Sequence, residues 1–235
     1  MKNPIKILSL LSFFFLISCG NKNEFPVAEW NSNNNAKPVL FYISGDAGFN
    51  SFSKNFGQNM HRFGYDVFAL NTRKYFWTKR TPESAAEDTE KFLKEITAKR
   101  TNKKIIIVGF SYGADVAPFI YNRFDAGFKK NIQNLVIIGP SKVNDFEIHL
   151  AEYVTGEKEY GFSVLNEINN VRNVPFTLIV SDFEFYHFPI SQIMLKNYSL
   201  LHLHGDHHYG GDTKRLAAFV NANLNKKVKM EHGGN

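Results

Sequence analysis

The sequence predicts an α/β fold with a mostly parallel sheet of about six strands flanked by helices. Short apolar runs alternate with longer segments of helical character between residues 38 and 224. Runs that are apolar throughout are typical of strands buried on both faces, as in parallel sheets. The 235 residues, 43% of them hydrophobic and 21% charged, suit one globular domain with a large core.

Six apolar runs are the predicted strands: 39–44, 66–71, 104–110, 135–139, 175–181 and 199–204. Four segments between and after them are the predicted helices: 49–63, 81–99, 115–123 and 213–224. Gly64 is a typical helix terminator, and Thr81-Pro82 combines a cap residue with a proline suited to the first helical position. Residues 143–170 are irregular and aromatic, and we interpret them as a small cap over a site.

The N-terminus predicts export and lipidation. Lys2 and Lys6 precede an apolar stretch, 7–17, which is too short to span a bilayer at about 20 residues. The stretch ends before Cys19, the only cysteine, and resembles a bacterial lipoprotein signal. We therefore expect a signal peptide at 1–18, a lipidated tether at 19–37 and a single domain at 38–235. A plain secretory peptide with an incidental cysteine is the alternative.

These features predict an exported protein that is lipid-anchored in the cell envelope and faces the periplasm or outer membrane. The formal charge of +6 is mild and spread along the chain. It suits work close to an anionic lipid surface and is too diffuse to predict nucleic-acid binding. The expected partner is a membrane phospholipid substrate, and the composition leaves the oligomeric state open.

One motif predicts the chemistry. The apolar run 105–108 leads into Gly109-Phe110-Ser111-Tyr112-Gly113, and a helix-like segment follows at once. A G-x-S-x-G motif between a strand and a helix is the nucleophile elbow of the α/β-hydrolase fold, where a tight turn holds the serine hydroxyl above the sheet edge. Ser111 is therefore the candidate nucleophile.

The other parts of a serine triad follow in the expected order of serine, acid and histidine. Asp182 and Glu184 come directly after the strand at 175–181, and the sequence does not separate them as the acid. His207 lies beyond the last strand and is the preferred base, with His208 close behind.

An oxyanion hole requires two backbone N–H groups. The candidates are the amide of Tyr112, directly after the nucleophile, and that of Asp46 in the loop after the first strand.

The histidine-rich segment also permits a metal hypothesis. Residues 202–207 read His-Leu-His-Gly-Asp-His, which matches the H-x-H-x-D-H pattern of the metallo-β-lactamase fold. That fold needs further ligands well downstream, and only Asp212 and His232 follow here. A zinc-dependent hydrolase is therefore the weaker alternative, and we expect no metal and no cofactor.

Together these motifs resemble the bacterial virulence-protein family called VirJ or AcvB. The resemblance rests on VLFYISGDAGFN, RKYFWTKRTPESAAEDTEKFL, IIIVGFSYGADVAPF and HGDHHYGGD. It implies an exported α/β-hydrolase and the hydrolysis of lysyl-phosphatidylglycerol, an aminoacylated membrane lipid. It places the nucleophile at Ser111 and the histidine in the GDHH segment. The region of the acid departs most from the family pattern.

A lysyl ester of this lipid is a cation on an anionic lipid. Asp46, Asp115 and His208 are candidate substrate-binding residues, and the two carboxylates could pair with an ammonium group. Asp115 also has a purely structural explanation, because a carboxylate in the first turn of a helix is stabilised by the helix dipole. A non-catalytic binding lipoprotein that keeps the hydrolase fold is the alternative function, since a fold does not guarantee its chemistry.

Overall fold

The computed structural model describes residues 25–32, 34–149, 161–196 and 198–224. Cys19 and the expected signal peptide lie outside this range. Within these segments, no helix has both the length and the apolar character needed to cross a bilayer.

A seven-stranded sheet forms the centre of the domain, one strand more than the six predicted. The strands follow the spatial order β1-β3-β2-β4-β5-β8-β9, and every neighbouring pair is parallel except β1 with β3. The bounds are β1 (Val27–Trp30), β2 (Val39–Ile43), β3 (Asp66–Leu70), β4 (Ile105–Phe110), β5 (Ile132–Ile138), β8 (Phe176–Val180) and β9 (Tyr198–His202). The predicted fold class is confirmed.

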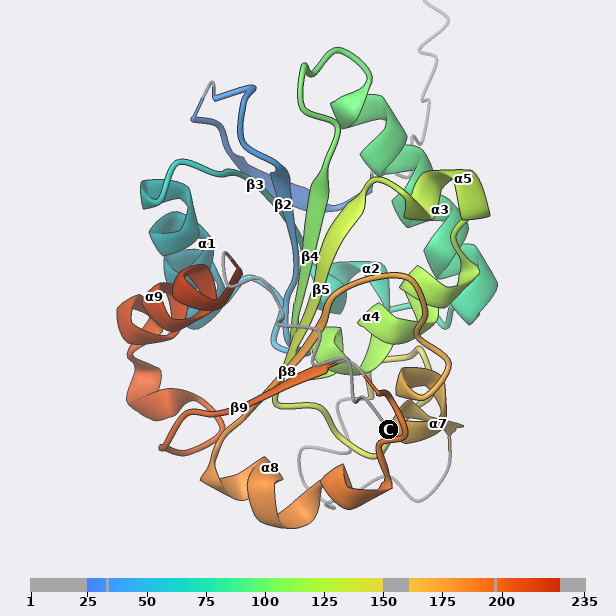
Figure 1. Ribbon diagram of the computed structural model, residues 1–235, viewed down its shortest axis with the longest axis vertical. Helices are drawn as coiled ribbons and strands as arrows, with labels where there is room; N and C mark the ends of the chain where they lie inside the picture. The colour runs from blue at the N-terminus through green and yellow to red at the C-terminus, as the bar shows by residue number, and fades with distance from the viewer. Residues whose placement is uncertain (1–24, 33, 150–160, 197, 225–235) are drawn as a thin grey trace, which may run out of the picture.

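Helices cover both faces of the sheet, as Figure 1 shows. On one face lie α1 (Ser51–Arg62) and α9 (Thr213–Leu224), and on the other α3 (Pro82–Thr97), α4 (Tyr112–Arg123) and α5 (Ala126–Lys129). Strand β2 explains the two cores: Phe41 and Ile43 pack into one apolar cluster, whereas Leu40 and Tyr42 pack into the other. Apolar side chains on both sides of each central strand therefore require two helical layers.

Short elements complete the fold. They are α2 (Thr72–Tyr75), the β6 (Val143–Asn144) and β7 (Phe162–Ser163) pair, α7 (Val164–Ile168), α8 (Asp182–His187), η1 (Ile190–Gln192) and η2 (Tyr209–Gly211). The segment predicted as an irregular cap, 143–170, thus contains a small antiparallel pair and a helix in its described part. Its residues 150–160 lie outside the described range.

Strand β1 falls inside the predicted tether, so that expectation differs from the structure at Val27–Trp30. These residues pair antiparallel with β3. The indole of Trp30 lies against α1 so closely that a Cβ added to Gly57 would be 2.8 Å from it. Packing of this aromatic side chain holds a four-residue strand that its asparagine-rich surroundings did not predict.

The parallel strands all end at one edge of the sheet. The residues that follow β2, β4, β5, β8 and β9 therefore come together there, at the lower edge in Figure 1. In open α/β sheets this edge is where ligands bind.

Candidate active site

Ser111 occupies a strained turn between β4 and α4. Its φ of 54° and ψ of −121° lie outside the regions that side-chain-bearing residues ordinarily adopt. Its N–H donates to the carbonyl of Ile138 on the neighbouring strand at 2.9 Å, and its own carbonyl accepts from Ala114 and Asp115. The backbone of the turn is therefore held from both sides, as strain at a functional site requires.

The two glycines of the elbow are needed for close approach. A Cβ on Gly113 would be 2.0 Å from the carbonyl oxygen of Ile43, and one on Gly109 would be 2.2 Å from the carbonyl oxygen of Gly113. Neither glycine has a positive φ; within the motif, the residue with a positive φ is Ser111. The motif therefore brings α4 against β2 and β4 at a distance that no side chain permits.

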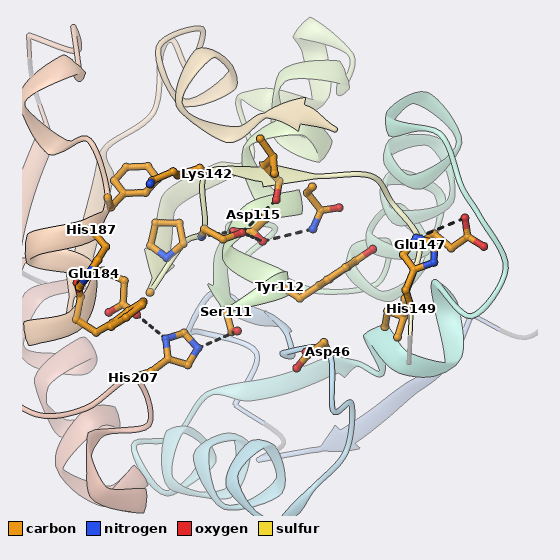
Figure 2. A pocket seen from close by; sticks show the side chains of 18 residues that line it. Asp46, Ser111, Tyr112, Asp115, Lys142, Glu147, His149, Glu184, His187 and His207 are labelled. Atoms are coloured by element: carbon orange, nitrogen blue, oxygen red, sulfur yellow. Dashed lines mark hydrogen bonds and ion pairs between the residues drawn. The ribbon is translucent and has the colours of Figure 1, made fainter. Parts of the chain in front are cut away.

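Ser111, His207 and Glu184 form one continuous line of hydrogen bonds, drawn in Figure 2. The Oγ of Ser111 lies 2.9 Å from Nε2 of His207, and the Nδ1 of His207 lies 2.5 Å from Oε1 of Glu184. Three residues that are 96 and 23 positions apart in the chain meet in the order expected of a nucleophile, a base and an acid.

Glu184 is positioned by the first turn of α8. Its Oε2 accepts hydrogen bonds from both the backbone N–H, at 2.9 Å, and the hydroxyl of Ser181, which caps the helix. This capping box leaves Oε1 for His207 and keeps the carboxylate buried. Ser181 was not among the predicted site residues, although the Ser181-Asp182-Phe183-Glu184 spacing is the sequence signature of such a box.

Asp182, the other candidate acid, lies away from His207. Its Oδ1 contacts His202 Nε2 at 2.7 Å and His204 Nδ1 at 2.8 Å, and its Oδ2 accepts from the N–H of Gly205 at 2.9 Å. Asp182 and Glu184 occupy the same helical turn but point to different groups, so the structure separates two residues that the sequence left equivalent.

The pKa values fit a coupled acid–base pair. Burial opposes protonation of His207, but its hydrogen bond to Glu184 and the negative charge of that residue outweigh burial and raise the histidine pKa above its ordinary value. Burial acts to raise the pKa of Glu184, yet hydrogen bonds from His207 and Ser181 lower it overall. The carboxylate therefore stays ionised and favours an imidazolium at His207.

The loop that follows β2 lies beside the nucleophile. A Cβ on Gly45 would be 3.4 Å from that of Ser111. The hydroxyl of Thr72 donates to the carbonyl of Gly45. Because C=O and N–H of a trans peptide point in opposite directions, the N–H of Asp46 is directed away from Thr72. Asp46 and Tyr112, the predicted oxyanion-hole residues, both line the cavity next to Ser111.

A cavity of about 390 Å³ opens beside the triad. Sequence analysis identified Asp46, Ser111, Tyr112, Asp115, Glu184 and His207 among its lining residues but missed others with polar or aromatic side chains. The missed residues are Ser141, Lys142, Asn144, Glu147, His149, Phe183, His187 and Phe188. Most belong to the segment interpreted as a cap or to α8, where no motif distinguishes individual residues.

Asp115 is almost fully buried, and its hydrogen bonds support a structural role for this residue. Its carboxylate accepts from the N–H and the hydroxyl of Ser141, each at 2.6 Å, and from the side chain of Asn144 at 3.4 Å. Burial raises the pKa of Asp115 to about 7, although these hydrogen bonds oppose the rise. Asp115 thus ties α4 to the loop after β5.

His208 is not among the residues that line the cavity. Its ring packs edge-on against Phe52 and Phe110, at 5.6 and 5.8 Å between ring centroids. Burial and then the neighbouring charge of His207 lower the pKa of His208. The preference for His207 over His208 as the base agrees with this geometry, whereas a substrate-binding role for His208 receives no support.

The H-x-H-x-D-H segment is not assembled as the zinc alternative requires. His207 faces Ser111, and the Asp206 carboxylate accepts from the N–H groups of His208 and Gly210, both at 2.9 Å. His202 and His204 instead gather around Asp182. The motif is divided between two places, so its histidines and Asp206 do not surround one common position.

The fold and the site define an α/β-hydrolase-fold protein with a Ser–His–Glu constellation at the carboxyl edge of its sheet. The family model of the bacterial virulence protein VirJ matches residues 37–228. The chain belongs to this family, which confirms the resemblance. No curated protein sequence matches it significantly.

Solved structures of the same fold are similar over most of the chain. An α/β-hydrolase-family protein from Desulfitobacterium hafniense has a TM-score of 0.58 and 13% identity, covering 85% of this chain and 100% of its own. Est1E from Butyrivibrio proteoclasticus, solved with ferulic acid, has a TM-score of 0.59 and 14% identity, covering 85% of this chain and 95% of its own. A membrane phospholipase A described as a bacterial virulence factor has a TM-score of 0.58 and 14% identity, covering 84% of this chain and 81% of its own.

Proposed function

We propose that this protein is a lipid-anchored serine hydrolase that cleaves an ester of a membrane lipid, namely the aminoacyl ester of lysyl-phosphatidylglycerol or a similar lipid. The observation that supports hydrolysis most directly is the hydrogen-bonded line Ser111–His207–Glu184 beside a cavity. Together with a strained nucleophile backbone, this geometry suits covalent acyl transfer.

In the proposed reaction, His207 Nε2 takes the proton of Ser111 as Oγ attacks the ester carbonyl. The amides of Tyr112 and Asp46 stabilise the oxyanion, and Glu184 stabilises the imidazolium. Collapse expels the lipid alcohol, which takes the proton from His207, and leaves the acyl group on Ser111. Water, deprotonated by His207, then attacks this ester, releases the acid and restores the Ser111 hydroxyl.

The charges around the cavity support a substrate that carries both cationic and anionic groups. Asp46, Glu147 and His149 lie to the right of Ser111 in Figure 2, opposite Glu184 and His187. A lysyl group bound on this side would place its ammonium groups near the Asp46 and Glu147 carboxylates. Lys142 also lines the cavity and is suited to the lipid phosphate.

The surface next to the cavity supports a lipid substrate. Helix α8 exposes 53% of Phe183, 41% of Phe185 and 79% of Tyr186. Phe183 also lines the cavity, so this apolar surface continues into the site. Adjacent exposed aromatic side chains are suited to a membrane interface.

The fold is also that of a membrane phospholipase A, so it is compatible with lipid esters. Lipidation at Cys19 would hold the enzyme at such a surface.

The test is release of free lysine from vesicles that contain lysyl-phosphatidylglycerol. Wild type should release lysine, and Ser111→Ala should lower kcat/KM by about 10⁶-fold. Undiminished release by Ser111→Ala would overturn the serine mechanism. Release of fatty acid with no release of lysine would retain that mechanism and overturn the substrate.

A binding lipoprotein without chemistry is tested separately by labelling with a fluorophosphonate. The proposed enzyme should be labelled at Ser111, and His207→Ala should slow labelling strongly because the base is missing. A folded wild-type protein that resists the reagent would favour the binding function.

A further inference from the structure

Asp182, His202 and His204 form a cluster of metal-ligand type outside the triad. The Oδ1 of Asp182 lies 2.7 Å from His202 Nε2 and 2.8 Å from His204 Nδ1. One ligand atom from each residue falls within 4.8 Å of the others. The hydrolase mechanism uses none of these side chains, so the His-x-His part of the sequence motif has no role in it.

Two of the three residues, Asp182 and His202, are held in place by contacts outside the cluster. The backbone of Asp182 donates to the carbonyl of Gly205 at 3.1 Å, and Gly205 in turn donates to Asp182 Oδ2 at 2.9 Å. The ring of His202 stacks on Phe185 with 4.4 Å between centroids and 3° between planes. Outer contacts that fix a carboxylate and an imidazole in this way are typical of metal sites.

The donor set is suited to Zn²⁺. Two imidazole nitrogens and one carboxylate oxygen are zinc ligands, at about 2.0–2.2 Å from the ion, and three protein ligands leave the fourth position for water. The side chain of His204 is 79% exposed, so the fourth position would face solvent. An ion would replace the protons that the nitrogens now share with Oδ1, after a small outward movement of the ligands.

A second group, Asp145, Glu147 and His149, also satisfies the distance condition for a metal. It borders residues 150–160, which the structure does not describe, and two of its members line the cavity. The cluster at Asp182 is better defined because backbone and aromatic contacts orient Asp182 and His202.

We propose that Asp182, His202 and His204 bind one Zn²⁺ ion, which joins the start of α8 to the end of β9. These are the two segments that present Glu184 and His207: Glu184 is two residues after Asp182, and His207 is three residues after His204. In Figure 1, α8 lies beneath β8 and β9 at the edge of the sheet. The ion would restrain the separation between acid and base without contacting substrate, and the proposal does not depend on the proposed substrate.

The test is calorimetric titration of chelator-treated protein with Zn²⁺. We expect one ion per chain and a rise in thermal midpoint with Zn²⁺ concentration, because the ion binds the folded state. Since contacts outside the coordination shell change metal affinity by about 10- to 100-fold, His204→Ala should weaken binding at least tenfold. His204 is highly exposed, so its substitution should leave the fold intact. His202→Gln is the second variant.

Two controls locate the ion. His61→Ala, a distant histidine on α1, and His207→Ala, in the triad, should both retain the Zn²⁺ affinity of wild type. Amide hydrogen exchange in residues 182–187 and 203–208 should slow on addition of Zn²⁺ in wild type but not in His204→Ala. Absence of binding, unchanged affinity in His204→Ala, or loss of binding in His207→Ala would each overturn the proposal.

Discussion

On the nucleophile side of the cavity, the position of Ser111 is set by backbone packing, whereas on the acid–base side the positions of His207 and Glu184 are set by side-chain hydrogen bonds. The elbow is a local structure, in which Gly109 and Gly113 let α4 approach β2 and β4. The acid–base side joins α8 to a loop more than twenty residues later. A short motif can encode the first arrangement, but the second depends on how distant segments meet.

The two carboxylates of α8 give the sharpest test of the acid–base side. Glu184→Gln should lower kcat/KM by about 10⁴-fold, as expected when the acid of a triad no longer orients and stabilises its histidine. Asp182→Asn, in the same turn, should lower kcat/KM much less, because Asp182 contacts His202, His204 and Gly205 rather than His207. Steady-state kinetics on an ester substrate measures both. Equal losses of kcat/KM in the two variants would contradict the assignment of Glu184 as the acid of the triad.

Two glycines test the backbone side. Gly113→Ala should lower the free energy of unfolding by about 3 kcal/mol or more, the upper range for overpacking, because the obstructing atom is a backbone oxygen that cannot rotate away. Gly127→Ala is the matched control: it lies in α5 with no atom within 4 Å of an added Cβ. It should stabilise by about 0.4–1 kcal/mol. Denaturant unfolding measures both, and similar values for the two would contradict the packing argument.

The pH dependence of activity tests the electrostatics of the acid–base pair. Glu184 raises the pKa of His207 above its ordinary value of 6.5. Because the base must be neutral to accept the serine proton, kcat/KM should fall on acidification with an apparent pKa above 6.5. An NMR titration of the His207 ring should show a lower pKa in Glu184→Gln than in wild type. An unchanged pKa would mean that another group sets it.

A pH dependence of stability, rather than of activity, is expected from Asp115, which ties the elbow helix to the next loop. Its pKa is raised by burial from 3.8 to about 7, so the folded state binds the proton more tightly than the unfolded state. The stability from this proton is complete below about pH 4 and is lost as pH rises to about 7. Relative to Asp115→Asn, wild type should therefore lose stability between these pH values and then level off. If denaturant unfolding gave wild type and Asp115→Asn parallel profiles of unfolding free energy against pH, the prediction would be contradicted.

Local sequence patterns predicted the structure where they coincide with a structural necessity. The apolar runs identified the central strands because each is buried on both faces. These patterns missed β1, whose four residues depend on Trp30 packing against α1. They also did not predict α8, although the capping box was present in the sequence. The choice between Asp182 and Glu184 stayed open because both follow the same strand within one turn.

The amino-acid sequence alone predicts the fold class, the elbow at Ser111 and the chain order of the serine, carboxylate and histidine that meet in the site, because these depend on short-range patterns of side-chain size and polarity. Tertiary structure decided which carboxylate faces His207, where Asp115 and His208 lie, and that His202 and His204 gather at Asp182. These outcomes depend on the direction of side chains in loops brought together by the sheet, and no spacing along the chain encodes that direction.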